Sequence, residues 1–259
     1  IVQVQMTYLL DTFHGSSYFY RWHRDRSVSG GLSVTKSCHH FDLLNWWLDD
    51  IPVEVFAFGE RNSYGPDSPH IPSRYDCRQM PVATQKEFCP YHKRWNEGGV
   101  EQPKDDHLEA YAKVFSLPMN VQYPHPMWVY DEEIEIEDTY SAAIRYKGGA
   151  SVNYSLNASS PWEGYILGIQ GTHGRLETTH YVAPARCPFP VSPMETITCY
   201  PLFGQRQIHD VARVEGGHGG ADEALRREMF VGACQESEEL LAAAGTRDGA
   251  LAVAVGEGV

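Results

Sequence analysis

The chain has 259 residues, 42% of them hydrophobic, and is long enough to bury the core of one large or two small domains. Its net charge of −13 at pH 7 disfavours binding to nucleic acid or to an anionic membrane surface, because both are also negative. No apolar run approaches the roughly 20 residues that span a bilayer. The six cysteines are widely scattered and a chain of this size needs no disulfides, so we expect reduced thiols and a cytoplasmic location.

The first quarter of the chain is predicted to contain two strands and one helix. Residues 1–10 alternate between apolar and polar, as in a strand, and residues 11–31 form a long loop rich in aromatic residues and arginine. Residues 32–48 have apolar side chains at helical spacing, and residues 53–59 alternate again. This order predicts a strand, a loop, a helix and a second strand.

The middle of the chain has little periodicity. Residues 60–130 are rich in proline, tyrosine, histidine and charge, with one short helix expected at 106–116. A stretch of this length indicates a functional insertion or an interface arm. In the acidic run at 131–138, glutamate alternates with isoleucine, which is typical of a solvated edge strand, and a calcium site is the alternative.

The second half is predicted to form an antiparallel sheet. Residues 140–146 and 150–156 alternate on either side of a Lys-Gly-Gly turn, which predicts a hairpin. Further strands are expected at 164–170, 174–179, 195–202 and 207–214. Helices are expected at 221–230 and 236–244, and the start of a closing helix at 246–259. The fold class is therefore α+β, with a large open, mostly antiparallel β-sheet and helices on one face.

Candidate catalytic residues gather just after a glycine pair. Lys36, His39 and Asp42 follow one another at intervals of three, so they share one face of a helix. A carboxylate one turn from an imidazole can fix its tautomer, and a nearby ammonium can polarise an oxygen. We expect His39 to exchange a proton with substrate, Asp42 to orient it, and Lys36 to polarise the substrate oxygen. A structural histidine and a solvated lysine are the alternatives.

The same segment resembles the second-domain signature of the Gfo/Idh/MocA oxidoreductases, G-G-x-x-x-D-x-G-x-H-x-x-D. Gly30-Gly31, His39 and Asp42 match it, whereas Thr35 stands where many members have Asp and Ser37 where they have Gly. The loss of that carboxylate makes Thr35 a candidate substrate contact and leaves the substrate subclass open. Blocks that resemble the same subgroup follow in order at 134–139, 154–158, 171–177 and 216–222.

The resemblance implies an NAD(P)-dependent oxidoreductase that acts by hydride transfer on a sugar or cyclic polyol. The family's dinucleotide-binding turn and its Glu-Lys-Pro motif are not found in this sequence. We therefore interpret residues 1–245 as the C-terminal substrate-binding and catalytic domain. Residues 246–259 are interpreted as a helix that packs on a Rossmann domain absent from this chain, which would bind most of the NAD or NADP. The resemblance also implies a homo-oligomer that pairs through the sheet.

Several other residues are candidate substrate contacts. Arg21 and His23 lie in a loop dense in aromatic residues and cations, which suits a sugar-binding platform or a protein interface. Tyr154 and Trp162 lie at or near the end of an expected strand. His218 lies between two glycine pairs, where the backbone can approach a ligand closely or form a plain surface turn.

Other functions stay open at this stage. A zinc site is disfavoured, because Cys77, Cys89 and His92 have no second ligand pair, and we expect no metal. The first alternative function is an NAD-dependent glycoside hydrolase or lyase that acts through a keto intermediate. The second is a noncatalytic partner subunit, and the third is a cofactor-free isomerase or lyase that uses His39 and Lys36.

Overall fold

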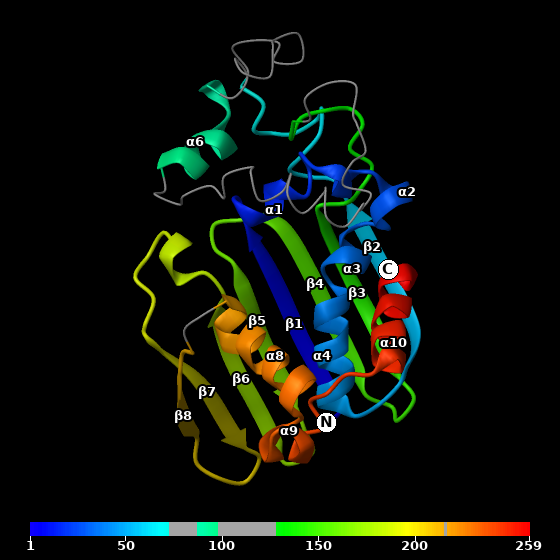
Figure 1. The fold of residues 1–259 in the computed structure, drawn as a ribbon, viewed down its shortest axis with the longest axis vertical. Coiled ribbons are helices and arrows are strands. Elements are labelled where there is room, and N and C mark those ends of the chain that lie inside the picture. Colours follow the sequence, from blue (N-terminus) through cyan, green and yellow to red (C-terminus); the bar gives the residue numbers. More distant parts are fainter. Residues whose placement is uncertain (73–86, 98–127, 215–216) are drawn as a thin grey trace.

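An eight-stranded sheet forms the framework of the computed structural model, which describes residues 1–72, 87–97, 128–214 and 217–259. The strand order is β2-β3-β4-β1-β5-β6-β7-β8 (Figure 1). β1 pairs with β4 in parallel, and the other neighbouring strands of the sheet are antiparallel. The strands are β1 Gln3–Asp11, β2 Pro52–Glu60, β3 Thr139–Tyr146, β4 Ser151–Ser160, β5 Gly164–Gln170, β6 Gly174–Tyr181, β7 Met194–Pro201 and β8 Gln207–Ala212.

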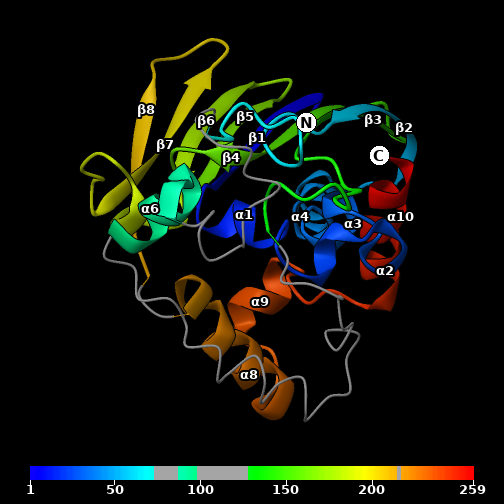
Figure 2. The same cartoon turned by 90° about the horizontal axis from the view of Figure 1, so that it is seen from above.

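Most of the helices lie on one side of this sheet (Figure 2). The helix α10 packs along α4 and against β2. The helices are α1 His14–Ser17, α2 Arg26–Ser29, α3 Leu32–Thr35, α4 Cys38–Leu48, α6 Pro90–Glu97, α8 Ala221–Val231, α9 Gln235–Glu239 and α10 Thr246–Gly258. This arrangement confirms the expected α+β fold with an open, mostly antiparallel sheet and helices on one face.

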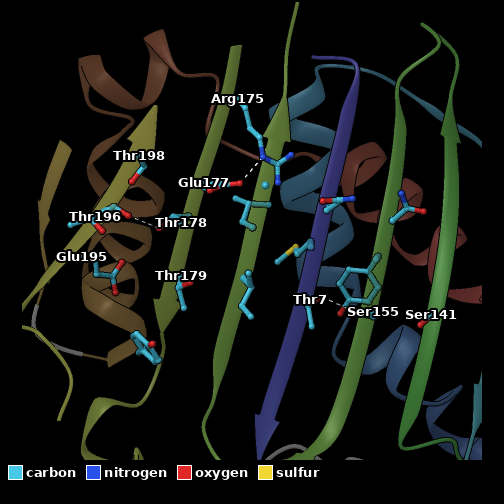
Figure 3. A pocket seen from close by; sticks show the side chains of 18 of the residues that line it. Thr7, Ser141, Ser155, Arg175, Glu177, Thr178, Thr179, Glu195, Thr196 and Thr198 are labelled. Carbon is cyan, nitrogen blue, oxygen red and sulfur yellow. Dashed lines mark hydrogen bonds and ion pairs between the residues drawn. The ribbon is translucent and has the colours of Figure 1, made fainter. Parts of the chain in front are cut away.

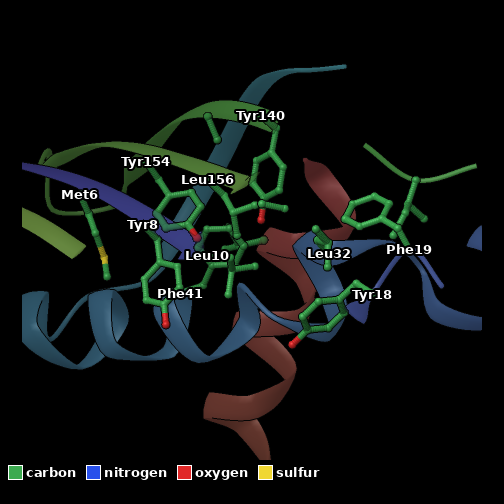
Figure 4. Packing of buried hydrophobic residues seen from close by; sticks show 14 of the residues in the cluster. Met6, Tyr8, Leu10, Tyr18, Phe19, Leu32, Phe41, Tyr140, Tyr154 and Leu156 are labelled. Carbon is green, nitrogen blue, oxygen red and sulfur yellow. The ribbon is translucent and has the colours of Figure 1, made fainter. Parts of the chain in front are cut away.

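The core lies between the sheet and α4. Alternation along β1 points Met6, Tyr8 and Leu10 toward the helices, while Gln5 and Thr7 lie on the opposite face. From the helical side, Phe41 of α4 is fully buried against these strands (Figure 4). The apolar face of α4 therefore fixes this helix, and the residues before it, against the centre of the sheet.

Apart from the acidic run at 131–138, the expected strands are confirmed, whereas several helix predictions need correction. The helix expected over 32–48 is broken between α3 and α4. The loop expected over 11–31 contains α1, α2 and a 3-10 turn at Trp22–Arg24. The helix expected over 236–244 ends at Glu239. The helix expected at 106–116 lies outside the described residues, and α6 was not expected.

The acidic run at 131–138 is not an edge strand, so that prediction is wrong. Its carboxylates have partners: the fully buried Arg24 forms ion pairs with Asp131 and Glu133. The carboxylate of Asp138 is also fully buried, and it accepts backbone N–H groups at residues 62–64. These ion pairs and hydrogen bonds hold the run in turns that lead to β3.

In the described part of the chain, no helix has both the length and the apolar character that a membrane crossing requires.

Candidate active site

The glycine pair and the helix break shape the candidate site. Gly30 and Gly31 have φ angles of 72° and 93°, which glycine adopts without strain, and they turn the chain from α2 into α3. At the end of α3, the Ser37 N–H donates to the Leu32 carbonyl five residues earlier, at 2.9 Å. This wide, π-type turn offsets α3 from α4. The predicted continuous helix therefore becomes two segments, with Lys36 and Ser37 between them.

A buried hydroxyl network anchors the break to the sheet. The Ser37 hydroxyl shares hydrogen bonds with the hydroxyls of Tyr140 on β3 and Tyr154 on β4, the latter at 2.9 Å. The Tyr154 hydroxyl also lies 2.7 Å from Nδ1 of His40 in the first turn of α4. The His40 ring stacks on Tyr8, with 3.8 Å between the centroids. Strands β1, β3 and β4 thus set the position of the first turn of α4.

The break separates Lys36 from His39, which a continuous helix would place on one face. Lys36 turns inward, and its Nζ lies 5.3 Å from the centroid of the Tyr8 ring. Burial lowers the pKa of Lys36, and the charges of Glu163 and Cys38 act in the opposite direction. His39 stays exposed on the outer side of α4. Lys36 is therefore partly buried against the sheet, whereas His39 faces solvent.

A backbone carbonyl orients His39. Its Nδ1 lies 3.1 Å from the Lys36 carbonyl oxygen, which can only accept a hydrogen bond. Nδ1 therefore carries the hydrogen in the neutral ring, and Nε2 is left as the proton acceptor. Among the described residues His39 makes no hydrogen bond to Asp42, so the Lys36 carbonyl provides the orientation expected from that carboxylate. Burial raises the pKa of Asp42, as does the charge of Asp248, while the charge of His39 lowers it.

A second group of polar residues lies near Lys36, at the end of the two central strands where β1 ends and β5 begins. The side chain of Glu163 is only 2% exposed, and its carboxylate accepts hydrogen bonds from His14 Nδ1 at 2.8 Å and Arg186 Nη2 at 2.5 Å. Burial raises the pKa of Tyr8, and the nearby charge of Glu163 raises it further. Burial alone would raise the pKa of Glu163, but the His14 hydrogen bond and the charges of His14, Lys36 and Arg186 lower it.

Local sequence patterns do not single out this group, although the sequence contains a signal for it. Asp11 and His14 follow one predicted strand, and Glu163 precedes another. The strands β1 and β5 are antiparallel neighbours in the sheet, so the end of β1 and the start of β5 bring these polar residues together. Their pairing could not be read from a single sequence.

Two predicted substrate contacts adjoin this group through Tyr18. The His14 and Tyr18 rings lie 5.4 Å apart, and His23 meets Tyr18 edge-on at 4.9 Å. Burial, with the nearby charges of Arg21 and His14, lowers the pKa of His23 to about 3, so its ring is neutral at pH 7. Arg21 donates to the Ser17 carbonyl at 2.8 Å. Arg21 and His23 thus extend the polar edge that Glu163 and His14 begin.

The other predicted contacts lie in different surroundings. The Thr35 hydroxyl donates to the Gly31 carbonyl at 2.9 Å, within the α3 turn. Tyr154 is buried beneath α4 and belongs to the hydroxyl network. The Trp162 ring packs on Tyr181, with 4.9 Å between the centroids, and precedes Glu163 in the chain. His218 belongs to the 3-10 turn Gly217–Gly220 before α8.

Comparison with known proteins agrees with this geometry. The family model described as "Oxidoreductase family, C-terminal alpha/beta domain" matches residues 1–259.

The chain belongs to the Gfo/Idh/MocA oxidoreductase family.

Similar proteins extend the comparison. The chain is 46% identical over 262 residues to YteT of Bacillus subtilis (strain 168), a protein named as an oxidoreductase. That match includes 100% of this chain and 60% of YteT, so the chain spans less than two thirds of that relative's length. A levoglucosan dehydrogenase solved in complex with NADH has the same fold, with a TM-score of 0.54, 10% identity, and coverage of 100% of this chain and 55% of that one. An oxidoreductase structure from Thermotoga maritima matches with a TM-score of 0.50 and 13% identity. That match covers 99% of this chain and 51% of the other.

The described residues of this Gfo/Idh/MocA domain do not fit a dinucleotide. Its sheet has one parallel strand pair, β1 and β4, and the chain between them returns through β2 and β3 rather than a single crossover helix. The Gly30-Gly31 turn leads from one helical turn to the next, so it does not form a strand-to-helix phosphate loop.

Among the described residues, no group of three or more His, Cys, Asp and Glu side chains could hold a metal ion. Cys77 lies outside the described residues, and the buried Cys89 lies 3.3 Å from the Tyr130 hydroxyl.

None of the described helices covers the opposite face of the sheet, which forms a broad, open groove of about 1040 Å³ (Figure 3). Thr7, Ser155 and the Arg175–Glu177 ion pair lie on it, the last at 2.7 Å. Phe56 and Phe58 of β2 are 64% and 73% exposed at its border. This face thus combines a polar floor with an exposed aromatic edge.

Proposed function

We propose that the chain is the substrate-binding and catalytic portion of an NAD(P)-dependent oxidoreductase that acts by hydride transfer on a sugar or cyclic polyol. One observation carries the proposal: the family signature folds into a break that presents a mostly buried lysine and an oriented histidine. Among the described residues, the Lys36 Nζ has no hydrogen bond or ion pair, so it can bind a substrate oxygen.

The reaction divides between the nicotinamide and this chain. A nicotinamide held by a Rossmann domain would supply the hydride acceptor, so that a carbinol and NAD(P)+ would yield a carbonyl, NAD(P)H and a proton. His39 takes the hydroxyl proton at Nε2, because Nδ1 is committed to the Lys36 carbonyl. The Lys36 ammonium stabilises the negative charge that develops on the substrate oxygen. Asp42 contributes a carboxylate on the same helix as His39.

The proposed substrate contacts come from several segments of the chain. Arg21 and His23 provide polar groups beside the Tyr18 ring, and Trp162 provides an aromatic face of the kind that stacks on sugars. His218 is proposed as a further contact from the turn before α8. Thr35 and Tyr154 support the site through the positions of α3 and α4.

The proposed partners follow from what the described residues do not supply. A Rossmann domain, in the same polypeptide or in a partner subunit, would bind NAD or NADP. α10 (Thr246–Gly258) is proposed to contact that domain as well as α4. A homo-oligomer through the open face of the sheet would cover Phe56 and Phe58, and we propose a cytoplasmic setting for the enzyme.

The test is a panel of sugars and polyols given to the full-length protein with NAD+ or NADP+. The proposal expects reduced nicotinamide to accumulate with at least one of them. Bond cleavage with no net reduced nicotinamide would favour the glycoside hydrolase or lyase instead. Turnover without any nicotinamide would indicate a cofactor-free isomerase or lyase. No turnover by a folded, nicotinamide-loaded protein would indicate a noncatalytic subunit.

A further inference from the structure

His14 is held in one orientation through both its backbone and its ring. One carboxylate oxygen of Asp11 accepts the backbone N–H groups of Phe13 and His14, at 3.0 and 2.8 Å. On the ring, Nδ1 lies 2.8 Å from Oε1 of Glu163. An ionised carboxylate can only accept a hydrogen bond, so Nδ1 carries a hydrogen and donates it. In the neutral ring Nε2 is therefore the proton acceptor.

Arg186 fixes the two carboxylates that hold His14. Its guanidinium donates to Oδ2 of Asp11 and to Oε2 of Glu163, both at 2.5 Å. The side chains of Asp11 and Glu163 are only 4% and 2% exposed, so neither carboxylate is open to a ligand. The His14 side chain, in contrast, is 34% exposed. The cluster thus buries its charges and leaves the imidazole within reach of a ligand.

The Nε2 atom of His14 has only a weak partner among the described residues. The Tyr18 hydroxyl lies 3.4 Å from it, which is long for a hydrogen bond. Burial raises the pKa of Tyr18 to about 12, so this hydroxyl keeps its hydrogen at neutral pH. A hydroxyl that comes closer can replace the contact or bridge the two side chains. Nε2 is therefore an oriented acceptor whose hydrogen-bonding capacity is not fully used.

We propose that His14 is a specificity-determining residue that accepts a hydrogen bond from a substrate hydroxyl at Nε2, and that Glu163 is the positioning residue that sets its tautomer. The inference rests on the proposed function, because a sugar or polyol carries hydroxyl groups of the kind that such an acceptor binds. His14 is also close to a proposed contact, since the Tyr18 ring lies between His14 and His23. The hydroxyl bound by His14 is not the one that reacts, which His39 deprotonates.

A second carboxylate–imidazole pair in the chain provides a matched control. Nδ1 of His180 lies 2.7 Å from the Glu195 carboxylate, and Nη1 of Arg213 lies 2.8 Å from it. The His180 side chain is 32% exposed, almost the same as that of His14. Glu195 lies on the open face of the sheet (Figure 3). A role that is merely structural predicts the same behaviour for both histidines, whereas the proposal predicts that only His14 responds to substrate.

The first experiment observes the two imidazoles directly by NMR. The full-length protein is prepared with 15N-labelled histidine, the two signals are assigned with His14→Gln and His180→Gln, and spectra are recorded at a mildly alkaline pH, where imidazoles are ordinarily neutral. We expect His14 to carry its hydrogen on Nδ1. In Glu163→Gln the other tautomer should gain population, because the amide oxygen is drawn to Arg186 and its NH2 group then faces His14.

The same spectra measure binding. Each sugar and polyol of the panel is added together with NADH or NADPH, so that an alcohol substrate can bind without being oxidised. At least one of them should shift the Nε2 signal of His14 and leave that of His180 in place. The response requires binding but no turnover, so it is independent of the hydride transfer.

The second experiment compares the substrate with analogues that each lack one hydroxyl other than the reacting one. In the parent protein, loss of the hydroxyl that His14 binds should lower kcat/KM by about tenfold, as expected for one hydrogen bond. His14→Phe should remove this preference, because the acceptor is gone. His180→Phe should retain it. A packing defect alone would lower kcat/KM for the substrate and for the analogue by the same factor.

The outcomes separate this inference from the proposed function. No shift of the His14 signal with any compound, an equal shift of the His180 signal, or an unchanged hydroxyl preference in His14→Phe would overturn the inference. An unchanged tautomer in Glu163→Gln would refute the role of Glu163. If a sugar shifts the His14 signal but the parent protein reduces no nicotinamide, the proposed function fails and the binding role stands. If His14→Phe does not fold, the binding spectra of the unsubstituted protein decide.

Discussion

Ser37→Ala tests whether the hydroxyl network holds the helix break in place. The substitution removes the hydroxyl that bonds to both Tyr140 and Tyr154, while Tyr154 keeps its contact with His40. Ser37 is fully buried, so the hydroxyl of Tyr140 loses a hydrogen-bond partner. A buried polar group left without its partner costs about 1–3 kcal/mol, so we expect a loss of about 2 kcal/mol in the free energy of unfolding. For a domain of this size that corresponds to a fall of about 4–8 °C in Tm.

Urea unfolding followed by tryptophan fluorescence measures this loss, with Ser155→Ala as the control. The Ser155 hydroxyl donates to Thr7 at 3.1 Å on the open face, where it is only half-buried. Its removal should change the free energy of unfolding by no more than about 0.5 kcal/mol. Equal losses for the two variants would refute the reasoning. Because Ser37 also holds the residues on either side of the break, kcat of Ser37→Ala should fall while Ser155→Ala retains the parent value.

Three further changes test other parts of the account. Gly15→Ala places a Cβ against the backbone carbonyl of Ala158 and should destabilise the protein by several kcal/mol in a denaturant series, about 3 or more; Gly249→Ala in α10, where nothing lies within 4 Å, should be neutral or stabilising. The folded-state pKa of His23, lowered to about 3 from 6.5, means that its neutral ring contributes stability above pH 6.5 that is lost as pH falls toward 3; His23→Gln should flatten the dependence of Tm on pH in that window, and an unchanged slope would contradict the burial of this ring. Phe58→Glu on the open face should lower the molar mass measured by analytical ultracentrifugation, and an unchanged mass would argue against pairing through that face.

Local patterns predicted the central strands β1, β3 and β4 clearly, because each of them is buried on one face. In β1 the buried residues alternate with more exposed ones; they are Val4, Met6, Tyr8 and Leu10. The hairpin of β3 and β4 likewise follows from alternation on both sides of a Lys-Gly-Gly turn. These signals depend only on residues close together in the chain.

The helix break and the acidic run could not be predicted because distant residues decide them. Ser37 leaves the helical pattern where its hydroxyl meets tyrosines more than 100 positions later in the chain. The carboxylate of Asp138 binds N–H groups about 75 positions earlier, which fixes the turns before β3. In both cases a buried polar contact prevails over local periodicity.

Only part of the candidate site could be predicted, because contacts between residues far apart in the chain decide the rest. The signature identified His39, and its spacing to Lys36 suggested one shared face, but the break at Ser37 separates the two residues. Glu163 became visible only when β1 and β5 were paired. Sequence patterns thus identified the chemical groups, whereas the contacts of those groups could be found only once the pairing of the strands was known.

The most direct test of the central claim is the rate of hydride transfer in a single turnover of the full-length protein with Lys36→Met. Lys147→Met, in the exposed turn between β3 and β4, is the matched control. Loss of an electrostatic stabiliser of the substrate oxygen should slow the step by about 100- to 1,000-fold, while the control keeps the parent rate. Equal rates for the parent, Lys36→Met and Lys147→Met would contradict the account.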